Sequence, residues 1–355
     1  MYVRFVALLG SIAAFAACSS GNGVTPLLGQ RQPANRPVSS IVQSKAATSP
    51  GIWTPKAPMP VSQFGFGISS AKDKYGVEAI YVIGGIDSSY FFGPTQVYHP
   101  ATDMWTRAAT LPTGRAALGL GNINGILYAV GGFSNGHSVS TVEAYDPVAN
   151  AWATKAPLPT PRDDLVVRVI DGILYAAGGE NYGNGHSVLA VRTVEAYDSA
   201  TNTWTTKTPM HAAHAGGAGA VVGGLLYVFG GLDSTGSSTS DVEAYDPATN
   251  AWTVRAPLPK PGYELAGGVA EHDVFALGGQ NNGGTVESYD PNANVWTTQT
   301  PLPKPRGREA FGARNVGGVL YAMGGITEGG TFINTVEAFT PGSNTSENPA
   351  LDADP

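Results

Sequence analysis

Residues 125–152 read GILYAVGGFSNGHSVSTVEAYDPVANAW. This stretch consists of a short apolar run, a glycine pair at 131–132, a variable polar loop, a VEAYDP segment and a single tryptophan, Trp152. The apolar run and the VEAY run are rich in β-branched and aromatic residues and are bounded by glycine or by Asp-Pro, which is typical of β-strands joined by turns. Because no long apolar pattern with a 3.6-residue period occurs, we expect strands and no helices.

The same order of parts recurs along most of the chain. Six glycine pairs start at positions 84, 131, 178, 230, 278 and 324, so that successive pairs are 47, 47, 52, 48 and 46 residues apart. All six tryptophans of the chain belong to this pattern, namely Trp53, Trp105, Trp152, Trp204, Trp252 and Trp296. A period near 50 built from strand-like segments is typical of the blades of a β-propeller.

The repeated segments resemble those of the Kelch-repeat β-propellers, which carry Y-x-x-G-G, V-x-x-Y-D-P and a downstream Trp. The resemblance covers residues 51–341 and implies an all-β fold of six blades, each with four antiparallel strands. In the repeat quoted above, the innermost strand starts near Arg115 and the second ends at the glycine pair, while the third carries Tyr145 and the outermost carries Trp152. We expect Tyr and Trp to pack between neighbouring blades, and the glycines to lie where backbones approach too closely for a Cβ atom.

The two ends of the repeat region complement each other. The last repeat has no tryptophan after Pro341, whereas the folded part starts with Trp53 and has no glycine pair before it. We therefore predict that the segment around Trp53 supplies the missing outer strand of the sixth blade. Closing the ring in this way would remove the exposed sheet edge.

The N-terminal segment, residues 1–17, has the form of an export signal. One positive charge, Arg4, precedes a 13-residue apolar run, which is shorter than the roughly 20 residues of a membrane-spanning helix. The sequence FAACS around Cys18 resembles a bacterial lipoprotein box, which implies that Cys18 is lipidated and holds the protein on a membrane surface. Ser19 after it implies sorting to the outer membrane. The alternative is an ordinary signal that is cleaved near Ala17 and leaves Cys18 as a free thiol.

The rest of the chain divides by composition. Residues 18–50 are rich in Ser, Gly, Pro, Gln and Ala and predict a flexible tether, and the polar residues 342–355 predict a disordered tail. The propeller between them would be a single domain, which we expect to be monomeric. The chain carries a formal charge of -7 and no cluster of Lys or Arg, so we expect no nucleic-acid partner.

Candidate binding residues gather at the start of the inner strands. Aligning the repeats on the Leu-Pro before each inner strand places six residues at one equivalent position: Gln63, Arg115, Arg162, His214, Gly262 and Arg306. Two positions further on stand Gly65, Ala117, Asp164, Gly216, Glu264 and Arg308. We expect the charges to lie at one mouth of the ring, where they would bind a polar or anionic small molecule or a peptide carboxylate. The predicted binding residues are Arg115, Arg162, Asp163, Asp164, Tyr263, Glu264, Arg306, Arg308 and Glu309, with Glu264 and Glu309 as catalytic candidates.

A structural role for the arginines is the alternative. An Arg at the aligned position is common in Kelch repeats, and pairing with carboxylates would neutralise Arg115, Arg162 and Arg306. The residues that break the repeat pattern would then carry the site, namely Asp163, Asp164, Tyr263, Glu264, Arg308 and Glu309, with Glu180 as a weaker candidate.

No metal or cofactor is predicted. His137 and His186 occupy the same N-G-H-S loop of two repeats, and His211 and His214, three apart on an expected strand, would point to opposite faces. The Kelch copper oxidases need a cysteine cross-linked to a tyrosine, and Cys18 lies outside the propeller. The chain contains no G-x-S-x-G, Walker or H-E-x-x-H motif.

Two functions remain open, and we favour the first. A non-enzymatic module would bind a protein or glycan at the cell surface, using loop aromatics such as Tyr90, Phe91, Phe92 and Tyr182. The alternative is an enzyme similar to the exported Kelch propellers that epimerise or mutarotate sialic acid. That resemblance implies an acid/base role for Glu264 or Glu309 and a carboxylate site made by Arg162, Arg306 and Arg308. A purely structural envelope protein would bind no saturable ligand.

Overall fold

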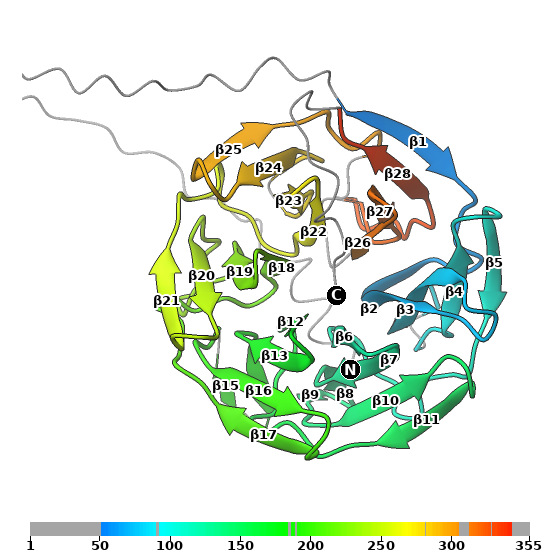
Figure 1. The fold of residues 1–355 in the computed structure, drawn as a ribbon, viewed down its shortest axis with the longest axis horizontal. Coiled ribbons are helices and arrows are strands. Elements are labelled where there is room, and N and C mark those ends of the chain that lie inside the picture. Colours follow the sequence, from blue (N-terminus) through cyan, green and yellow to red (C-terminus); the bar gives the residue numbers. More distant parts are fainter. Residues whose placement is uncertain are drawn as a thin grey trace, which may run out of the picture. The chain divides into compact units, whose positions relative to one another are not determined.

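The strands of this protein form a closed ring of blades. The computed structural model describes residues 51–89, 92–183, 186–188, 190–280, 282–304, 312–327 and 329–342. These residues form strands β1 to β28 and contain no helix. Six sheets of four antiparallel strands surround a central axis, as Figure 1 shows. The predicted all-β, six-bladed propeller is therefore confirmed.

Each blade is a four-stranded meander that starts at the axis. From the axis outward, the strands of the first three blades are β2 (Gln63–Lys72), β3 (Glu78–Asp87), β4 (Gln96–His99) and β5 (Met104–Arg107) in blade 1; β6 (Gly119–Ile123), β7 (Ile126–Val130), β10 (Val142–Asp146) and β11 (Ala151–Thr154) in blade 2; and β12 (Val166–Ile170), β13 (Ile173–Ala177), β16 (Val194–Asp198) and β17 (Thr203–Thr206) in blade 3.

The remaining blades repeat this order. Their strands are β18 (Ala218–Val222), β19 (Leu225–Phe229), β20 (Val242–Asp246) and β21 (Ala251–Val254) in blade 4; β22 (Ala266–Ala270), β23 (Asp273–Leu277), β24 (Val286–Asp290) and β25 (Val295–Thr298) in blade 5; and β26 (Gly312–Val316), β27 (Val319–Met323), β28 (Val336–Thr340) and β1 (Ile52–Lys56) in blade 6.

The ring is closed by the first strand of the chain. β1 pairs antiparallel with β28, in a register that places Trp53 opposite Phe339. The two rings lie 4.9 Å apart between centroids. The predicted closure by the Trp53 segment is thus confirmed, and blade 6 combines strands from both ends of the repeat region.

The glycine pairs join each blade to the next. In blade 3, Gly178 has φ +65°, and a Cβ atom on it would lie 2.3 Å from the carbonyl oxygen of His214 in blade 4. The next residue, Gly179, donates its N–H to the same carbonyl at 2.7 Å. The pairs at 84–85, 131–132, 230–231 and 324–325 make the equivalent contact with the carbonyl of the following blade. A side chain at the first glycine would therefore separate two blades.

The tryptophans connect neighbouring blades at the outer part of the ring through hydrogen bonds. Trp152 donates its indole N–H to the carbonyl of Ala109, in the segment that connects blades 1 and 2, at 2.9 Å. Asn150, with φ +51°, accepts hydrogen bonds from the Tyr145 hydroxyl and from the Ala109 N–H, each at 2.8 Å. All six tryptophans make the equivalent bond to a backbone carbonyl. The repeated tyrosine, turn and tryptophan therefore form one fastening between blades.

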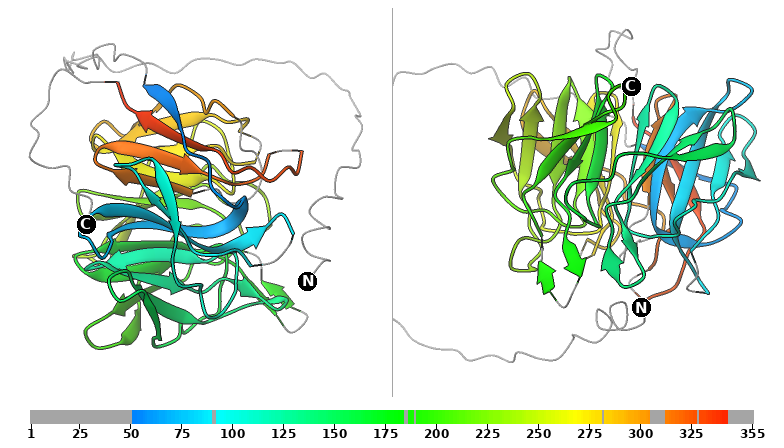
Figure 2. Two further views of the ribbon diagram at one scale, coloured as in Figure 1. Left: turned by 90° about the vertical axis from the view of Figure 1, so that its right-hand side faces the viewer. Right: turned by 90° about the horizontal axis from the view of Figure 1, so that it is seen from below.

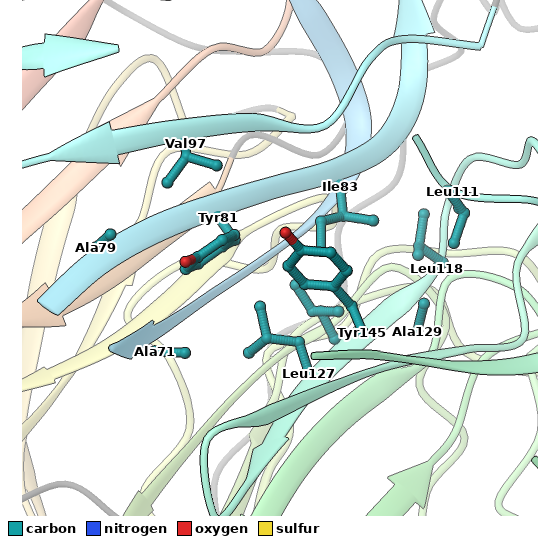
Figure 3. Close-up of a cluster of buried hydrophobic side chains, with 11 residues drawn as sticks. Ala71, Ala79, Tyr81, Ile83, Val97, Leu111, Leu118, Leu127, Ala129 and Tyr145 are labelled. Atoms are coloured by element: carbon teal, nitrogen blue, oxygen red, sulfur yellow. The ribbon is translucent and has the colours of Figure 1, made fainter. Parts of the chain in front are cut away.

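The hydrophobic core lies between the blades. Figure 3 shows the cluster between blades 1 and 2, in which Tyr81 and Tyr145 lie side by side with ring centroids 5.9 Å apart. Tyr128 and Tyr197 form the same contact between blades 2 and 3, at 5.6 Å. The predicted packing of aromatic side chains between blades is confirmed, and each blade depends on both neighbours for burial.

Candidate functional site

A ring of backbone hydrogen bonds surrounds one mouth of the central axis. It consists of the residues at or just before the start of the inner strands of blades 1 to 5: Gly65, Ala117, Asp164, Gly216 and Glu264. From Ala117 onward, each N–H donates to the carbonyl of the preceding member, at 2.6 Å for Ala117, 2.9 Å for Asp164 and Gly216, and 2.6 Å for Glu264. All five have positive φ, between +52° and +63°. We call this set the mouth ring.

Two mouth-ring positions carry a carboxylate where glycine fits better. Gly65 and Gly216 adopt the left-handed backbone without steric penalty, whereas an L-residue there costs about 1 kcal/mol, and less for Asp, which tolerates this region. Glu264 nevertheless holds φ +58° and Asp164 holds φ +52°. Ala117 holds φ +54° in the same ring, so the left-handed backbone belongs to the ring as a whole, and Asp164 and Glu264 are site candidates because they are its charged members.

Blade 3 brings three carboxylates together beside the mouth ring. Asp163 is 1 % exposed, and its backbone pairs with that of Glu180 through bonds of 3.0 and 2.9 Å. Carboxylate oxygens of Asp163, Asp164 and Glu180 lie within 4.8 Å of one another. An all-oxygen set suits a hard cation such as Ca²⁺. Since an acidic cluster alone does not define a metal site, we assign no metal to it.

Blade 5 holds its carboxylate with an amide and a phenol. The Tyr263 hydroxyl donates to Gln280 Oε1 at 2.5 Å, and Gln280 Nε2 donates to Glu264 Oε2 at 2.9 Å. Gln280 follows a glycine pair, as Glu180 does in blade 3, and each pairs with the start of its own inner strand. Sequence reasoning missed Gln280, although its polar side chain directly after the glycine pair was the available signal.

The residues that break the repeat pattern therefore meet on one face. Asp163, Asp164 and Glu180 come from blade 3, while Tyr263 and Glu264 come from blade 5. Their role in binding stays a prediction. Arg306, Arg308 and Glu309 lie outside the described residues, as does Cys18.

Arg115 and Arg162 do not form a cationic rim, and that prediction is wrong. Both side chains are 0 % exposed. Arg162 binds Glu195 at 2.7 Å and the carbonyls of Gly178 and Thr193 at 2.6 and 2.9 Å. Arg115 binds Glu143 at 2.5 Å and the Gly131 carbonyl at 2.8 Å. Burial lowers the pKa of both guanidinium groups, and the paired carboxylates act in the opposite direction.

The residues equivalent to Arg115 and Arg162 in blades 1 and 4 make a similar structural contact. Gln63 donates to the Gly84 carbonyl at 2.7 Å, and His214 lies 2.6 Å from the Gly230 carbonyl. Blades 1 to 4 thus use this side chain to bind the carbonyl of their own glycine pair. Arg115 and Arg162 therefore have the structural role that the alternative interpretation gave them.

His211 and His214 both lie beside Glu243, so the expectation that they point to opposite faces is wrong. Their ring nitrogens lie 2.7 and 3.6 Å from the Glu243 carboxylate. Both residues precede β18 in an irregular segment, where the alternation of a strand does not apply. Burial raises the pKa of Glu243, but the nearby His214 ring and hydrogen bonds from Ala212 and His211 outweigh this effect and lower the pKa to about 2.

Comparison with known proteins supports the Kelch propeller fold. A family model described as the KLHDC2/KLHL20/DRC7 Kelch-repeats domain matches residues 74–279, and a Kelch motif model matches residues 307–348. The chain belongs to this Kelch-repeat family. A solved structure titled "Structure of YjhT" covers 81% of this chain and 99% of its own, with a TM-score of 0.67 and 18% identity, a likeness that shows the fold alone. No curated protein matches the chain.

Blade 5 lacks the side-chain hydrogen-bond donor that blades 1 to 4 use at the aligned position. Gly262 occupies the position of Arg115 and Arg162, and Glu287 occupies that of their partners Glu143 and Glu195. Glu287 Oε2 is buried and receives no hydrogen bond within the described chain. Burial raises the pKa of the Glu287 carboxyl. The carboxylate is therefore a structural liability in this blade.

Glu287→Gln is expected to stabilise the propeller at neutral pH by about 1 kcal/mol, because it removes a half-buried charge whose Oε2 receives no hydrogen bond, while Oε1 can still accept from the Thr298 hydroxyl. A raised folded pKa means that the folded state binds the proton more tightly than the unfolded one. The gain should therefore be full above the folded pKa and disappear as the pH falls below 4.5, the ordinary value. Urea unfolding at several pH values measures it. Glu143→Gln is the matched control and should destabilise, and stabilisation by both variants would contradict the assignment.

Of the loop aromatics expected to contact a partner, Phe92 and Tyr182 lie within the described residues and both pack against blade 2. Phe92 packs on blade 2, where a Cβ atom at Gly114 would lie 2.5 Å from its ring. Tyr182 is 36% exposed and lies 6.0 Å from the Phe133 ring. Tyr182 belongs to the hairpin β14 (Asn181–Gly183) and β15 (His186–Val188), which lies beside β8 (Phe133–Ser134) and β9 (His137–Ser138), as Figure 2 shows from the side. Tyr90 and Phe91 lie outside the described residues.

Proposed function

We propose that this Kelch propeller is a non-enzymatic module that binds a protein or glycan through the face of the mouth ring. The observation that carries the proposal is the convergence of Asp164, Glu180 and Glu264 on this face, where Gly65 and Gly216 show that the fold needs no side chain. A Kelch propeller supplies the rigid scaffold that such a binding face requires. Fold alone does not fix function, so the proposal rests on these side chains.

The described part of this face is acidic. Asp163, Asp164 and Glu180 form one carboxylate group, and Glu264 adds another on the far side of blade 4. Carboxylates accept hydrogen bonds and attract cations, so the matching partner presents Arg, Lys or hydroxyl groups. Tyr182 adds an exposed aromatic ring near the carboxylates of blade 3, through the hairpin that follows Glu180.

Glu264→Gly is expected to raise the stability of the propeller by about 1 kcal/mol and to weaken binding of the partner by tenfold or more. Glycine relieves the left-handed backbone strain, as it already does at Gly65 and Gly216. Thermal unfolding measures the first effect, and titration against lysine- and arginine-rich peptides and hydroxyl-rich glycans measures the second. Glu264→Gln is the matched control, which removes the charge and keeps the strain. A variant with unaltered binding would place the contact elsewhere.

An enzyme that acts on an acidic sugar such as sialic acid is the second candidate. The hydrogen-bonded series from Tyr263 through Gln280 to Glu264 favours it, because it orients a carboxylate beside a phenol at the mouth. Following the C3 methylene protons of sialic acid by NMR, whose chemical shifts differ between the two anomers, tests it. Accelerated interconversion that Glu264→Gln abolishes would replace the binding module with the enzyme.

We further propose that the protein is exported and anchored to the cell envelope through a lipid on Cys18. The form of residues 1–17 and the position of the single cysteine support this. In the described part of the chain, no helix is long and apolar enough to cross a membrane. Cys18→Ser is expected to move the protein from the membrane fraction to the soluble one, as fractionation and immunoblotting would measure. Retention of the variant in the membrane would contradict lipid anchoring.

A further inference from the structure

One level of the axial channel carries two arginines. In each blade, one inner-strand residue is paired with the aromatic residue of the second strand, Tyr or Phe. These six residues are Ser69, Gly121, Arg168, Ala220, Gly268 and Arg314, and all of them line a single cavity on the axis. Four are small, as expected where six strands crowd together, and two are long and cationic.

The two arginines approach the axis from opposite sides. Each inner strand contacts those of the two neighbouring blades, in the order β2, β6, β12, β18, β22, β26 and back to β2. Arg168 lies on β12 and Arg314 on β26, three blades apart in a ring of six. Figure 1 shows these strands on opposite sides of the axis. Both positive charges therefore belong to one narrow space.

Both side chains donate hydrogen bonds to neutral groups of the chain. Arg168 donates to the carbonyl of Val167 at 2.8 Å and to that of Gly267, on blade 5, at 3.3 Å. Arg314 Nε donates to the Ser70 hydroxyl, on blade 1, at 3.1 Å. Within the described chain, the residues that line the cavity include Asn122 and Asn315 but no Asp or Glu. The lining is therefore polar and positively charged.

We propose that the axial cavity is a binding site for a compact oxyanion, the size of a carboxylate, phosphate or sulfate group, held between Arg168 and Arg314. The planar guanidinium fork matches the geometry of such oxygens, and two forks from opposite sides enclose one anion. The fold does not need these arginines, because four blades have Ser, Gly or Ala at the same position. The site requires no mouth-ring side chain, so it stands independently of the proposed binding face.

Titration with anions tests the site. The full chain is titrated with sodium phosphate, sulfate and acetate against chloride at constant ionic strength, with melting temperature and calorimetric Kd as readouts. A ligand of the native state raises the melting temperature by mass action. We expect a saturable shift in the wild type, at least tenfold weaker binding in Arg168→Ala or Arg314→Ala, and no saturable binding in the double variant. Alanine is the residue that blade 4 already carries there, at Ala220.

Arg107→Ala is the matched control, because it removes an exposed positive charge on the outer strand β5. It should leave the shift unchanged, and an equal loss would indicate general screening and overturn the site. Unaltered saturation in the double variant, or no saturable shift in the wild type, would also overturn it. Peptides with free and amidated C-termini distinguish a peptide carboxylate from a free anion.

Discussion

Gly178→Ala is expected to destabilise the propeller by about 3 kcal/mol, the sum of left-handed strain and a broken contact between blades. The added methyl group would lie 2.3 Å from the His214 carbonyl, which also accepts the Gly179 N–H. Blades 3 and 4 would have to separate at this point. Equilibrium unfolding in urea measures the loss.

Gly172→Ala is the matched control in the same blade. Its φ is +76°, and a Cβ atom on it would meet nothing within 4 Å. We expect this variant to lose only the strain term, about 1 kcal/mol. Equal losses at the two positions would show that backbone conformation alone explains the glycine pairs, and that the contact between blades adds nothing.

Arg162→Ala is expected to destabilise the protein by about 3–5 kcal/mol, because it leaves Glu195 buried and without its cationic partner. The variant also removes the donor to the carbonyls of Gly178 and Thr193. Both effects act on the interior of blade 3. Urea unfolding of the wild type and the variant measures the difference.

The double variant Arg162→Ala with Glu195→Gln separates the two effects. If the unpaired carboxylate causes most of the loss, neutralising it should recover more than half of the stability. Arg168→Ala, at a position where other blades have small residues, serves as the control and should change stability by less than about 1 kcal/mol. If Arg162→Ala lowered the free energy of unfolding only slightly, a structural role would be contradicted and Arg162 would again be a candidate for ligand binding.

The fold was predictable because its determinants repeat. A glycine pair, a tyrosine and a tryptophan each occur at nearly constant spacing, and each makes a contact that every blade must make. The missing tryptophan after Pro341 and the additional Trp53 predicted how the ring closes, and β1 confirms it. Repetition shows which residues the fold requires, and it shows this without any knowledge of their partners.

The site was less predictable because aligning the repeats places a residue in the blade but does not show where its side chain points. The sequence placed Arg115 and Arg162 at the mouth, but their side chains turn into the blade toward Glu143 and Glu195, two strands away. Gln280 directly follows a glycine pair, and the sequence analysis treated this position as an ordinary part of the repeat, so Gln280 was missed. Asp164 and Glu264, which depart from the repeat, lie in the mouth ring, and their role in binding stays a prediction.

The axial arginines illustrate the same point. The inner strands read GLGNI, AGAVV and AGGVA in three blades, but VVRVI around Arg168 and GARNV around Arg314. A long cation among small residues was visible in the sequence. That both side chains line one cavity on the axis became apparent only from the structure.

A binding screen of the soluble propeller, from Ser49 onward, is the measurement to make first. The wild type and the double variant Asp164→Gly with Glu264→Gly are applied in parallel to arrays of basic peptides and of neutral and acidic glycans. Both proteins should be folded, the variant with the higher melting temperature. We predict saturable binding of a basic or hydroxyl-rich ligand by the wild type and its loss in the variant. Equal binding by both proteins, or no ligand at all, would contradict a binding site on the face of the mouth ring.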